Sequence, residues 1–356
     1  MRRVFEHWLE KYFSDPQAIL LIVLMLGFSL TLVYFGNTLL PVFVSIGCAY
    51  LLQGWINTLE KKFKLSHTLS YILVFTIFLS IFVTSLVLLV PLLWRQLVAL
   101  ITEFPGLVQS TKKLLMQLID DNNFFLNSQH VEAIGNAIIS EAQSLGKRLF
   151  SISLSSITGI ISWALYLVLV PFLVFFLLKD KSLLVNWVKN LLPQQHDLFS
   201  KLWSEMDVQM GNYIRGKATE IVVVGVANYA IFWALGLHYP VLLSCLVGLS
   251  VVIPYVGATV ITIPVLLIAY LQWGLIGGIS GKFAMLALSY GIVQFLDGNI
   301  LVPLLFSEAV NLHPIAIIVA ILLFGSLGGV WGIFFAIPLA TFIKAVLNAW
   351  PTYKNP

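Results

Sequence analysis

Long uninterrupted apolar runs constrain this chain more than any other feature of its sequence. The run "AILLIVLMLGFSLTLVY" (18–34) is long enough to cross a hydrocarbon core of about 30 Å as a helix. The chain is 59% hydrophobic and only 10% charged, whereas a soluble protein averages roughly 25% charged residues. Too few polar side chains remain to cover a globule in water. The sequence therefore predicts an all-α polytopic membrane protein.

Five apolar segments are predicted to span the membrane: 18–35, 39–57, 68–94, 156–178 and 219–237. Basic residues orient them, because positive charge stays on the cytoplasmic side. Arg2, Arg3 and Lys11 precede the first span and "KKFK" (61–64) follows the second, whereas "GNT" (36–38) between them carries no basic residue. We expect a cytoplasmic N-terminus and, from Lys344 and Lys354, a cytoplasmic C-terminus.

The order of apolar and polar stretches predicts five regions along the chain. They are 1–94 with three spans, 95–155 outside the membrane, 156–178 as the fourth span, 179–218 on the cytoplasmic side and 219–350 as a C-terminal core. The outer region has apolar residues at helical spacing, and we expect Pro105–Gly106 and "DDNN" (120–123) to break it into amphipathic helices.

The cytoplasmic region 179–218 contains two amphipathic stretches on either side of Pro193. They predict a helical hairpin along the inner membrane surface, with Trp187 and Trp203 at headgroup depth.

Two longer apolar runs are interrupted. "IPYVG" (253–257) divides 239–271, and "GSLGG" (325–329) divides 312–348. Each run is either one kinked crossing, which gives about eight spans, or a re-entrant hairpin, which gives six. We favour eight, because that arrangement places Lys282 on the cytoplasmic side.

The two interruptions are candidate binding positions for a solute or an ion. Backbone that unwinds at membrane depth survives only inside protein or beside water, where its free carbonyls can bind a ligand. The residues concerned are Pro254, Tyr255, Gly257, Gly325, Gly328 and Gly329. Glycines at this spacing also suit close helix packing, which is the alternative interpretation.

One carboxylate, Asp297, lies within the apolar stretch "GIVQFLDGNILVPLLF" (291–306). An ionised carboxylate at the bilayer centre is costly, so it should face protein or water and could carry a proton. Gln294 lies on the same helical face, and Asn299 joins them only if the helix unwinds at Gly298. The alternative is that "DGN" marks a turn at the membrane interface.

Five further residues lie where apolar segments begin. We expect Glu220 to form an interfacial salt bridge, and Arg215 and Lys217 in "YIRGKA" (213–218) to contact lipid phosphate or form a hinge. His313, followed by Pro314, should cap the last apolar segment.

The sequence offers no sign of an enzyme. Walker A, HExxH and GxSxG motifs are absent, and Cys48 and Cys245 lie in apolar runs as packing residues rather than metal ligands. We expect no cofactor. The net charge of +4 is too small to indicate a nucleic-acid partner.

Six stretches in order, "FLVFFLLKDK", "YIRGKA", "IPYVGA", "QFLDGNILVPLLF", "NLHPIAII" and "GSLGGVWGIFFAIPLA", resemble the autoinducer-2 exporter family, also described as PerM-like permeases. The resemblance implies a multi-pass protein of the bacterial cytoplasmic membrane that forms homo-oligomers. Members are assigned export of autoinducer-2, and others sodium or lithium/proton antiport.

Three functions therefore remain open. The first is a secondary exporter of a small polar solute. The second is a sodium (or lithium)/proton antiporter that uses Asp297, which should lose all activity as Asp297→Asn. The third is a non-transporting scaffold, which should tolerate that change but not changes in 95–154 or 180–217.

Overall fold

The chain is helical throughout the part that the computed structural model describes, and that part contains no strand. It comprises residues 27, 30–31, 34–36, 38–122, 133, 136–137, 139–141, 144, 157–190, 197–254, 256–274, 281–306 and 312–349. The prediction of an all-α fold is confirmed. Helices satisfy their own backbone hydrogen bonds, which an apolar solvent requires.

Five helices in the described part are long and apolar enough to cross a membrane. They cover Leu40–Phe63, His67–Gln109, Trp203–Leu235, Val256–Trp273 and Lys282–Phe306, and shorter apolar helices cover Ala164–Lys179, Pro240–Ser250, Ile315–Gly329 and Gly332–Ala345. The chain is therefore a polytopic membrane protein. Most of the first predicted span, 18–35, lies outside the described residues.

The third predicted span continues far beyond residue 94. Helix α4 (His67–Thr84) leads through a π-helical turn, η1 (Ser85–Leu89), into α5 (Val90–Asn122), and Pro105 lies inside α5. The predicted break at Pro105–Gly106 is therefore wrong. The described part of α5 extends to Asn122, within "DDNN" (120–123).

Contacts to a neighbouring helix explain why α5 tolerates its proline. A proline inside a helix removes one hydrogen bond and costs about 3 kcal/mol. On α5, the Gln96 Oε1 atom accepts a 2.8 Å hydrogen bond from the Leu242 amide, and Glu103 accepts one of 2.6 Å from the Tyr239 hydroxyl. Both partners lie at the start of α10 (Pro240–Ser250). These two bonds join the part of α5 that precedes Pro105 to the start of α10.

The chain divides into two compact units. The first comprises Met1–Ile77, Val168–Ala218 and Pro303–Pro356, and the second Phe78–Leu167 and Thr219–Val302. Helix α9 (Asp197–Leu235) begins in the first unit and ends in the second. The amphipathic stretch that follows Pro193 is thus the start of α9, and α8 (Lys181–Asn190) is the stretch before it. Pro193 itself lies outside the described residues.

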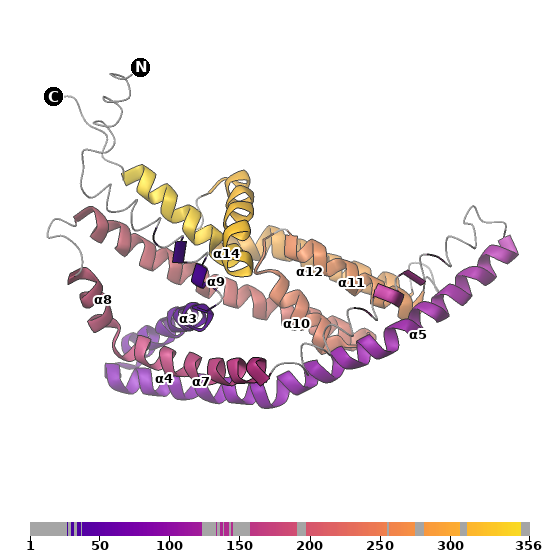
Figure 1. Cartoon of the computed structure of the whole chain (residues 1–356), viewed down its shortest axis with the longest axis horizontal. Coiled ribbons are helices and arrows are strands. Elements are labelled where there is room, and N and C mark those ends of the chain that lie inside the picture. The colour runs from indigo at the N-terminus through magenta and orange to yellow at the C-terminus, as the bar shows by residue number, and fades with distance from the viewer. Residues whose placement is uncertain are drawn as a thin grey trace, which may run out of the picture. The chain divides into compact units, whose positions relative to one another are not determined.

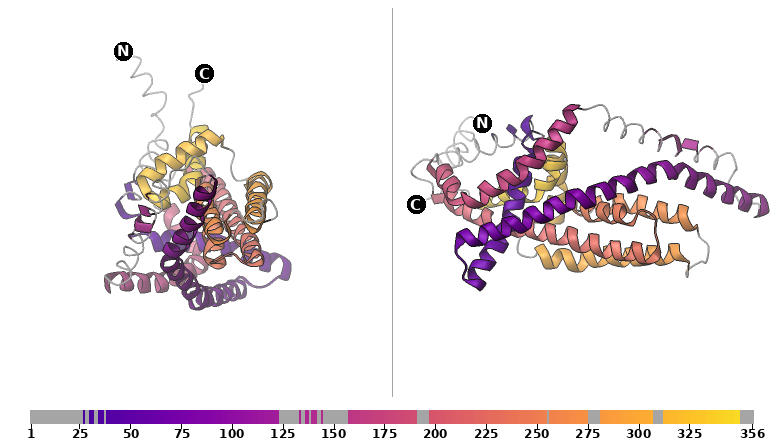
Figure 2. Two further views of the ribbon diagram at one scale, coloured as in Figure 1. Left: turned by 90° about the vertical axis from the view of Figure 1, so that its right-hand side faces the viewer. Right: turned by 90° about the horizontal axis from the view of Figure 1, so that it is seen from below.

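The second unit is a bundle of consecutive helices. It contains the end of α9, then α10, α11 (Val256–Trp273) and α12 (Lys282–Leu296). Helices α10 and α11 contact α5, and α12 packs against α11 (Figures 1 and 2). Its core is apolar and includes Val224, Phe232, Leu243, Val247, Val265, Ile268, Leu286 and Tyr290.

Helices α10 and α11 form a hairpin. Gln272, near the end of α11, donates a 2.8 Å hydrogen bond to the carbonyl of Gly236 and accepts one of 2.8 Å from the amide of His238. Residues that a single kinked helix would hold far apart are therefore in contact. The structure corrects the preference for one kinked crossing over 239–271 and agrees with the hairpin alternative.

A close backbone approach closes this hairpin. A Cβ atom added to Gly257 would lie 1.7 Å from the carbonyl oxygen of Ser250. In a straight helix these residues would be about 10 Å apart. Only glycine fits at position 257, so the "IPYVG" break is a tight turn between two limbs.

Helix α12 runs antiparallel to α11, and three contacts fix their register. Lys282 lies over the Trp273 ring at 5.9 Å, the rings of Phe283 and Tyr270 are 5.9 Å apart, and the Tyr290 hydroxyl is 2.9 Å from that of Thr262. Residue numbers rise along α12 as they fall along α11.

The first unit contains α3 (Leu40–Phe63), the end of α7 (Ile157–Lys179), α8, the start of α9, the end of α13 (Val302–Phe306) and α14 (Pro314–Ala349). Ser45 on α3 donates a 3.3 Å hydrogen bond to the Val170 carbonyl, and Tyr50 donates one of 2.7 Å to Asp207 on α9. Small and polar residues thus join these helices.

Helix α14 has two limbs that meet at an angle (Figure 1). Gly329 has the non-helical angles φ 57° and ψ −138°, and a Cβ atom on Gly332 would lie 1.8 Å from the carbonyl oxygen of Phe324. The "GSLGG" interruption is therefore a second sharp bend, which glycine permits because it lacks a Cβ atom.

Candidate functional site

A row of polar side chains follows one face of α12. Tyr290, Gln294 and Asp297 are spaced by four and then three residues, so they share a helical face. Tyr290 turns that face toward α11, because its hydroxyl contacts Thr262. The Asp297 side chain is only 8% exposed. On the side where α12 faces α11, the second unit thus holds the Asp297 carboxyl, the Gln294 carboxamide and the Tyr290 hydroxyl of α12, together with the Thr262 hydroxyl of α11.

The register of α11 and α12 places Asp297 beside the hairpin turn. Two helical turns beyond the contact of Thr262 with Tyr290, α11 begins at Val256 while α12 reaches Asp297. The "IPYVG" turn and the acid therefore occupy the same end of the second unit. Pro254 lies in the non-helical turn, and Tyr255 lies outside the described residues.

Asn299 does not join this row. The helix widens into a π-helical turn, η3 (Asp297–Leu301), instead of unwinding at Gly298, and α13 continues from it. The exposed Asn299 side chain donates a 2.8 Å hydrogen bond to the Phe295 carbonyl of its own helix. Single π-turns inside α-helices are rare and occur often at functional sites.

Helix α9 adds a residue that the sequence analysis missed. Val224, Asn228 and Phe232 recur every fourth position and are buried, and the Phe232 ring stacks on that of Tyr290 with centroids 6.3 Å apart. Asn228 is completely buried. A lone carboxamide in the apolar run "VVVGVANYAIFWAL" was the available signal, but nothing in the sequence showed which face of the helix it occupied.

Glu220 and Lys217, three residues apart on α9, are both buried, with 2% and 4% of their surface exposed. The Lys217 ammonium lies 5.1 Å from the centre of the Phe306 ring, and this contact belongs to the first unit. An aromatic face attracts a cation, and more strongly where water is excluded. Such deep burial does not favour lipid phosphate contact at Lys217 or an interfacial position for Glu220.

Arg215 is held within the first unit. Its guanidinium donates hydrogen bonds to the Tyr50 carbonyl at 3.5 Å and to Asn212 at 2.9 Å. A Cβ atom on Gly54 or Gly211 would lie 3.0 or 3.1 Å from the Arg215 side chain. The absence of side chains at these two glycines therefore leaves the space that the Arg215 side chain occupies.

The remaining predicted residues lie in or before α14. His313 accepts a 3.3 Å hydrogen bond at Nδ1 from the Ile315 amide, so it caps the helix that Pro314 begins, as expected. Gly325 packs against Ile333, where a Cβ atom would lie 2.9 Å from the Ile333 side chain. Gly328 has open space at its Cβ position, and Gly329 forms the bend.

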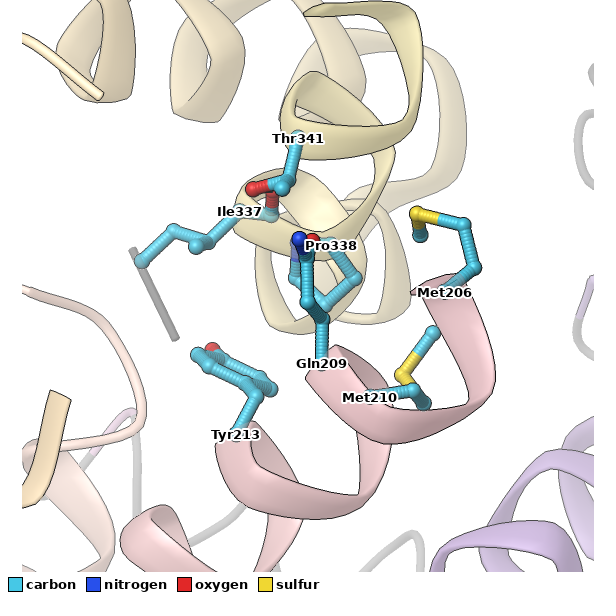
Figure 3. A pocket seen from close by; sticks show the side chains of 7 residues that line it. All are labelled: Met206, Gln209, Met210, Tyr213, Ile337, Pro338 and Thr341. Carbon is cyan, nitrogen blue, oxygen red and sulfur yellow. The ribbon is translucent and has the colours of Figure 1, made fainter. Parts of the chain in front are cut away.

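A pocket in the first unit lies between α9 and the second limb of α14. Met206, Gln209, Met210, Tyr213, Ile337, Pro338 and Thr341 line it (Figure 3). Pro338 has no amide to bond the Phe334 carbonyl, and the Tyr213 hydroxyl donates to that carbonyl at 3.2 Å. The tyrosine thereby replaces the helix bond that the proline removes.

The start of α10 holds a neutral tyrosine next to an acid. Burial, followed by the hydrogen bond to Glu103 and the negative charge of that carboxyl, raises the pKa of the Tyr239 hydroxyl above its ordinary value. Tyr239 therefore stays protonated and donates. Among the described residues, no cluster of three or more histidine, cysteine or acidic side chains could hold a metal ion.

A family model described as "AI-2E family transporter" matches residues 19–352. The chain belongs to the AI-2E transporter family. It is 42% identical over 352 residues to "Putative permease PerM" of Escherichia coli (strain K12), covering 99% of this chain and 98% of the relative. It is 29% identical over 310 residues to "Putative transport protein YrrI" of Bacillus subtilis (strain 168), covering 86% and 85%.

Membership of the AI-2E family makes this chain an integral membrane transport protein. A transporter needs polar groups at membrane depth that a passing solute or ion can use. The second unit of this AI-2E family member contains a row of polar side chains, Tyr290, Gln294 and Asp297.

Proposed function

We propose that the chain is a secondary exporter of a small polar solute and that autoinducer-2, after which its family is named, is the first solute to test. We propose further that it acts as a homo-oligomer in the bacterial cytoplasmic membrane, with both termini on the cytoplasmic side. The absence of a nucleotide-binding motif from the sequence agrees with a gradient as the energy source.

The row of Tyr290, Gln294 and Asp297, of which Tyr290 and Asp297 are buried, carries the proposal. Polar and ionisable side chains inside a membrane protein are costly to bury, and they often mark the path of a solute or an ion. The Asp297 end of the row lies beside the Gly257 turn. The side chains of the row can supply hydrogen bonds that replace the water around a polar solute.

Transport in sealed vesicles tests this function. The purified full chain is reconstituted in liposomes loaded with labelled autoinducer-2, ribose or glycerol, and efflux is followed with and without a proton or sodium gradient. We expect gradient-dependent efflux of at least one solute, absent from protein-free liposomes. A chain that moves none of the three under either gradient would refute the proposal and favour the scaffold function.

The burial of Asp297 favours a second candidate function, sodium (or lithium)/proton antiport. An antiporter needs one group that binds a cation and a proton in turn, and a buried carboxylate next to a π-turn can do both.

A sodium pulse distinguishes antiport from solute export. The first measurement is proton flux in proteoliposomes after the pulse, comparing the parent with Asp297→Asn. We expect the parent to move protons and Asp297→Asn to abolish the flux, because a carboxamide cannot titrate. Ser289→Ala on the same helix is the control, since its exposed hydroxyl bonds only its own helix. If the parent moves no protons after sodium or lithium pulses, antiport of these ions is excluded.

A further inference from the structure

Asn228 of the second unit has one satisfied and one unsatisfied end. Its Nδ2 atom donates a 2.8 Å hydrogen bond to the Val224 carbonyl, which fixes the orientation of the carboxamide. Its Oδ1 atom is buried and accepts no hydrogen bond from any described residue. Turning the carboxamide over would set two oxygens against each other at Val224, so the free acceptor is a property of the fold.

A second carboxamide, that of Gln294, is only weakly paired. The residue is partly exposed, and its buried Nε2 atom interacts with the Tyr290 hydroxyl without the geometry of a well-formed hydrogen bond. One buried acceptor without a partner among the described residues and one weakly paired donor thus lie within the same helical unit.

The helix register brings these two groups to one level. Helix α9 runs antiparallel to α10, because Gly225 approaches Ser244 and Gly248 while Ile221 approaches Gly248. Since α10, α11 and α12 then alternate in direction, α9 is antiparallel to α12.

Phe232 of α9 stacks on Tyr290 of α12. Asn228 lies one turn before Phe232 on α9, and Gln294 lies one turn after Tyr290 on α12. Because the two helices are antiparallel, these steps run in the same direction, and the two residues lie at the same level.

Other polar groups of this core are satisfied locally. The Ser244 hydroxyl donates to the Val241 carbonyl at 3.1 Å, and that of Thr262 bonds Ala258 at 2.7 Å. Asn228 bonds its own helix through Nδ2 in the same way, but its Oδ1 atom has no such local partner in the part of the chain that the structure describes. The unmet acceptor and the weakly paired donor match a ligand group that both donates and accepts, and a hydroxyl group does both.

We propose that Asn228 and Gln294 determine solute specificity in the second unit: Asn228 Oδ1 accepts a hydrogen bond from one hydroxyl of the solute, and Gln294 Nε2 donates to that hydroxyl. This assignment rests on the proposed transport function. The Asp297 carboxyl, one turn further along α12, and the Asn228 oxygen both disfavour an anion, so the site favours hydroxylated solutes without a negative charge.

The test uses near-isosteric variants of the full chain, Asn228→Leu and Gln294→Met, in proteoliposomes. KM and the maximal rate are measured for labelled autoinducer-2 and labelled ribose, with 2-deoxyribose as a competitor that lacks one hydroxyl. Melting temperatures in detergent are measured in parallel. Ser244→Ala is the matched control, because its buried hydroxyl is already bonded within its own helix.

We expect either variant to raise KM about tenfold or more, with the maximal rate within twofold of the parent, because a buried partner of a solute hydroxyl is lost. We also expect an unchanged or higher melting temperature for Asn228→Leu, since the variant removes an unsatisfied buried oxygen. Ser244→Ala should keep the parent KM.

Unchanged KM in both variants, together with lower melting temperatures, would overturn the inference and make both residues structural while leaving transport intact. A parent that moves no labelled solute would instead refute the proposed function itself, and the specificity assignment with it.

Discussion

At the residue scale, Pro338 explains the position of the Tyr213 hydroxyl. The proline leaves the Phe334 carbonyl without its helix donor, and the tyrosine supplies one from another helix. We expect Tyr213→Phe to cost about 1–2 kcal/mol of stability, seen as a lower melting temperature in detergent. Tyr270→Phe, whose ring packs on Phe283, is the control. In a Pro338→Ala background the restored amide should remove most of the effect, and a full effect there would contradict this account.

At the element scale, the α10–α11 hairpin depends on the missing side chain of Gly257. A methyl group at this position cannot coexist with the Ser250 carbonyl, so the turn must open. We expect Gly257→Ala to lower the melting temperature strongly and to abolish solute efflux. Gly291→Ala on α12 is the control, because its Cβ atom would meet nothing within 4 Å and alanine favours the helix. Equal behaviour of the two variants would show that the turn is not closed as described.

At the scale of the whole molecule, the hairpin decides which ends of helices share a side of the membrane. His238 and Lys282 lie at one end of the second unit, since Gln272 bonds His238 and Lys282 lies over Trp273. We expect His238→Cys and Lys282→Cys to react with an impermeant maleimide from the same side of intact cells. If 239–271 were a single crossing, the two cysteines would be labelled from opposite sides of the membrane. That outcome would contradict the hairpin.

The sequence predicted the parts of this structure that depend on local chemistry. Apolar runs indicated the helices, and Pro254 and Gly329 indicated where two of them are interrupted. The return of α11 toward Gly236 depends on Gln272, a tertiary contact that no local pattern reveals. Pro105 was misjudged for the same reason, because the bonds that offset it come from α10. Asp297 could be predicted as a lone acid, whereas Asn228 required the helix register.

The short limb of the hairpin has a consequence for how the protein is made. Helix α10 has 11 residues and, at about 1.5 Å per residue, covers roughly half of the hydrocarbon thickness. A helix of this length is too short to span the bilayer by itself. We therefore expect α10 to enter the bilayer together with α11, as a pair. On this account the turn at Gly257 matters for membrane insertion as well as for the finished transporter.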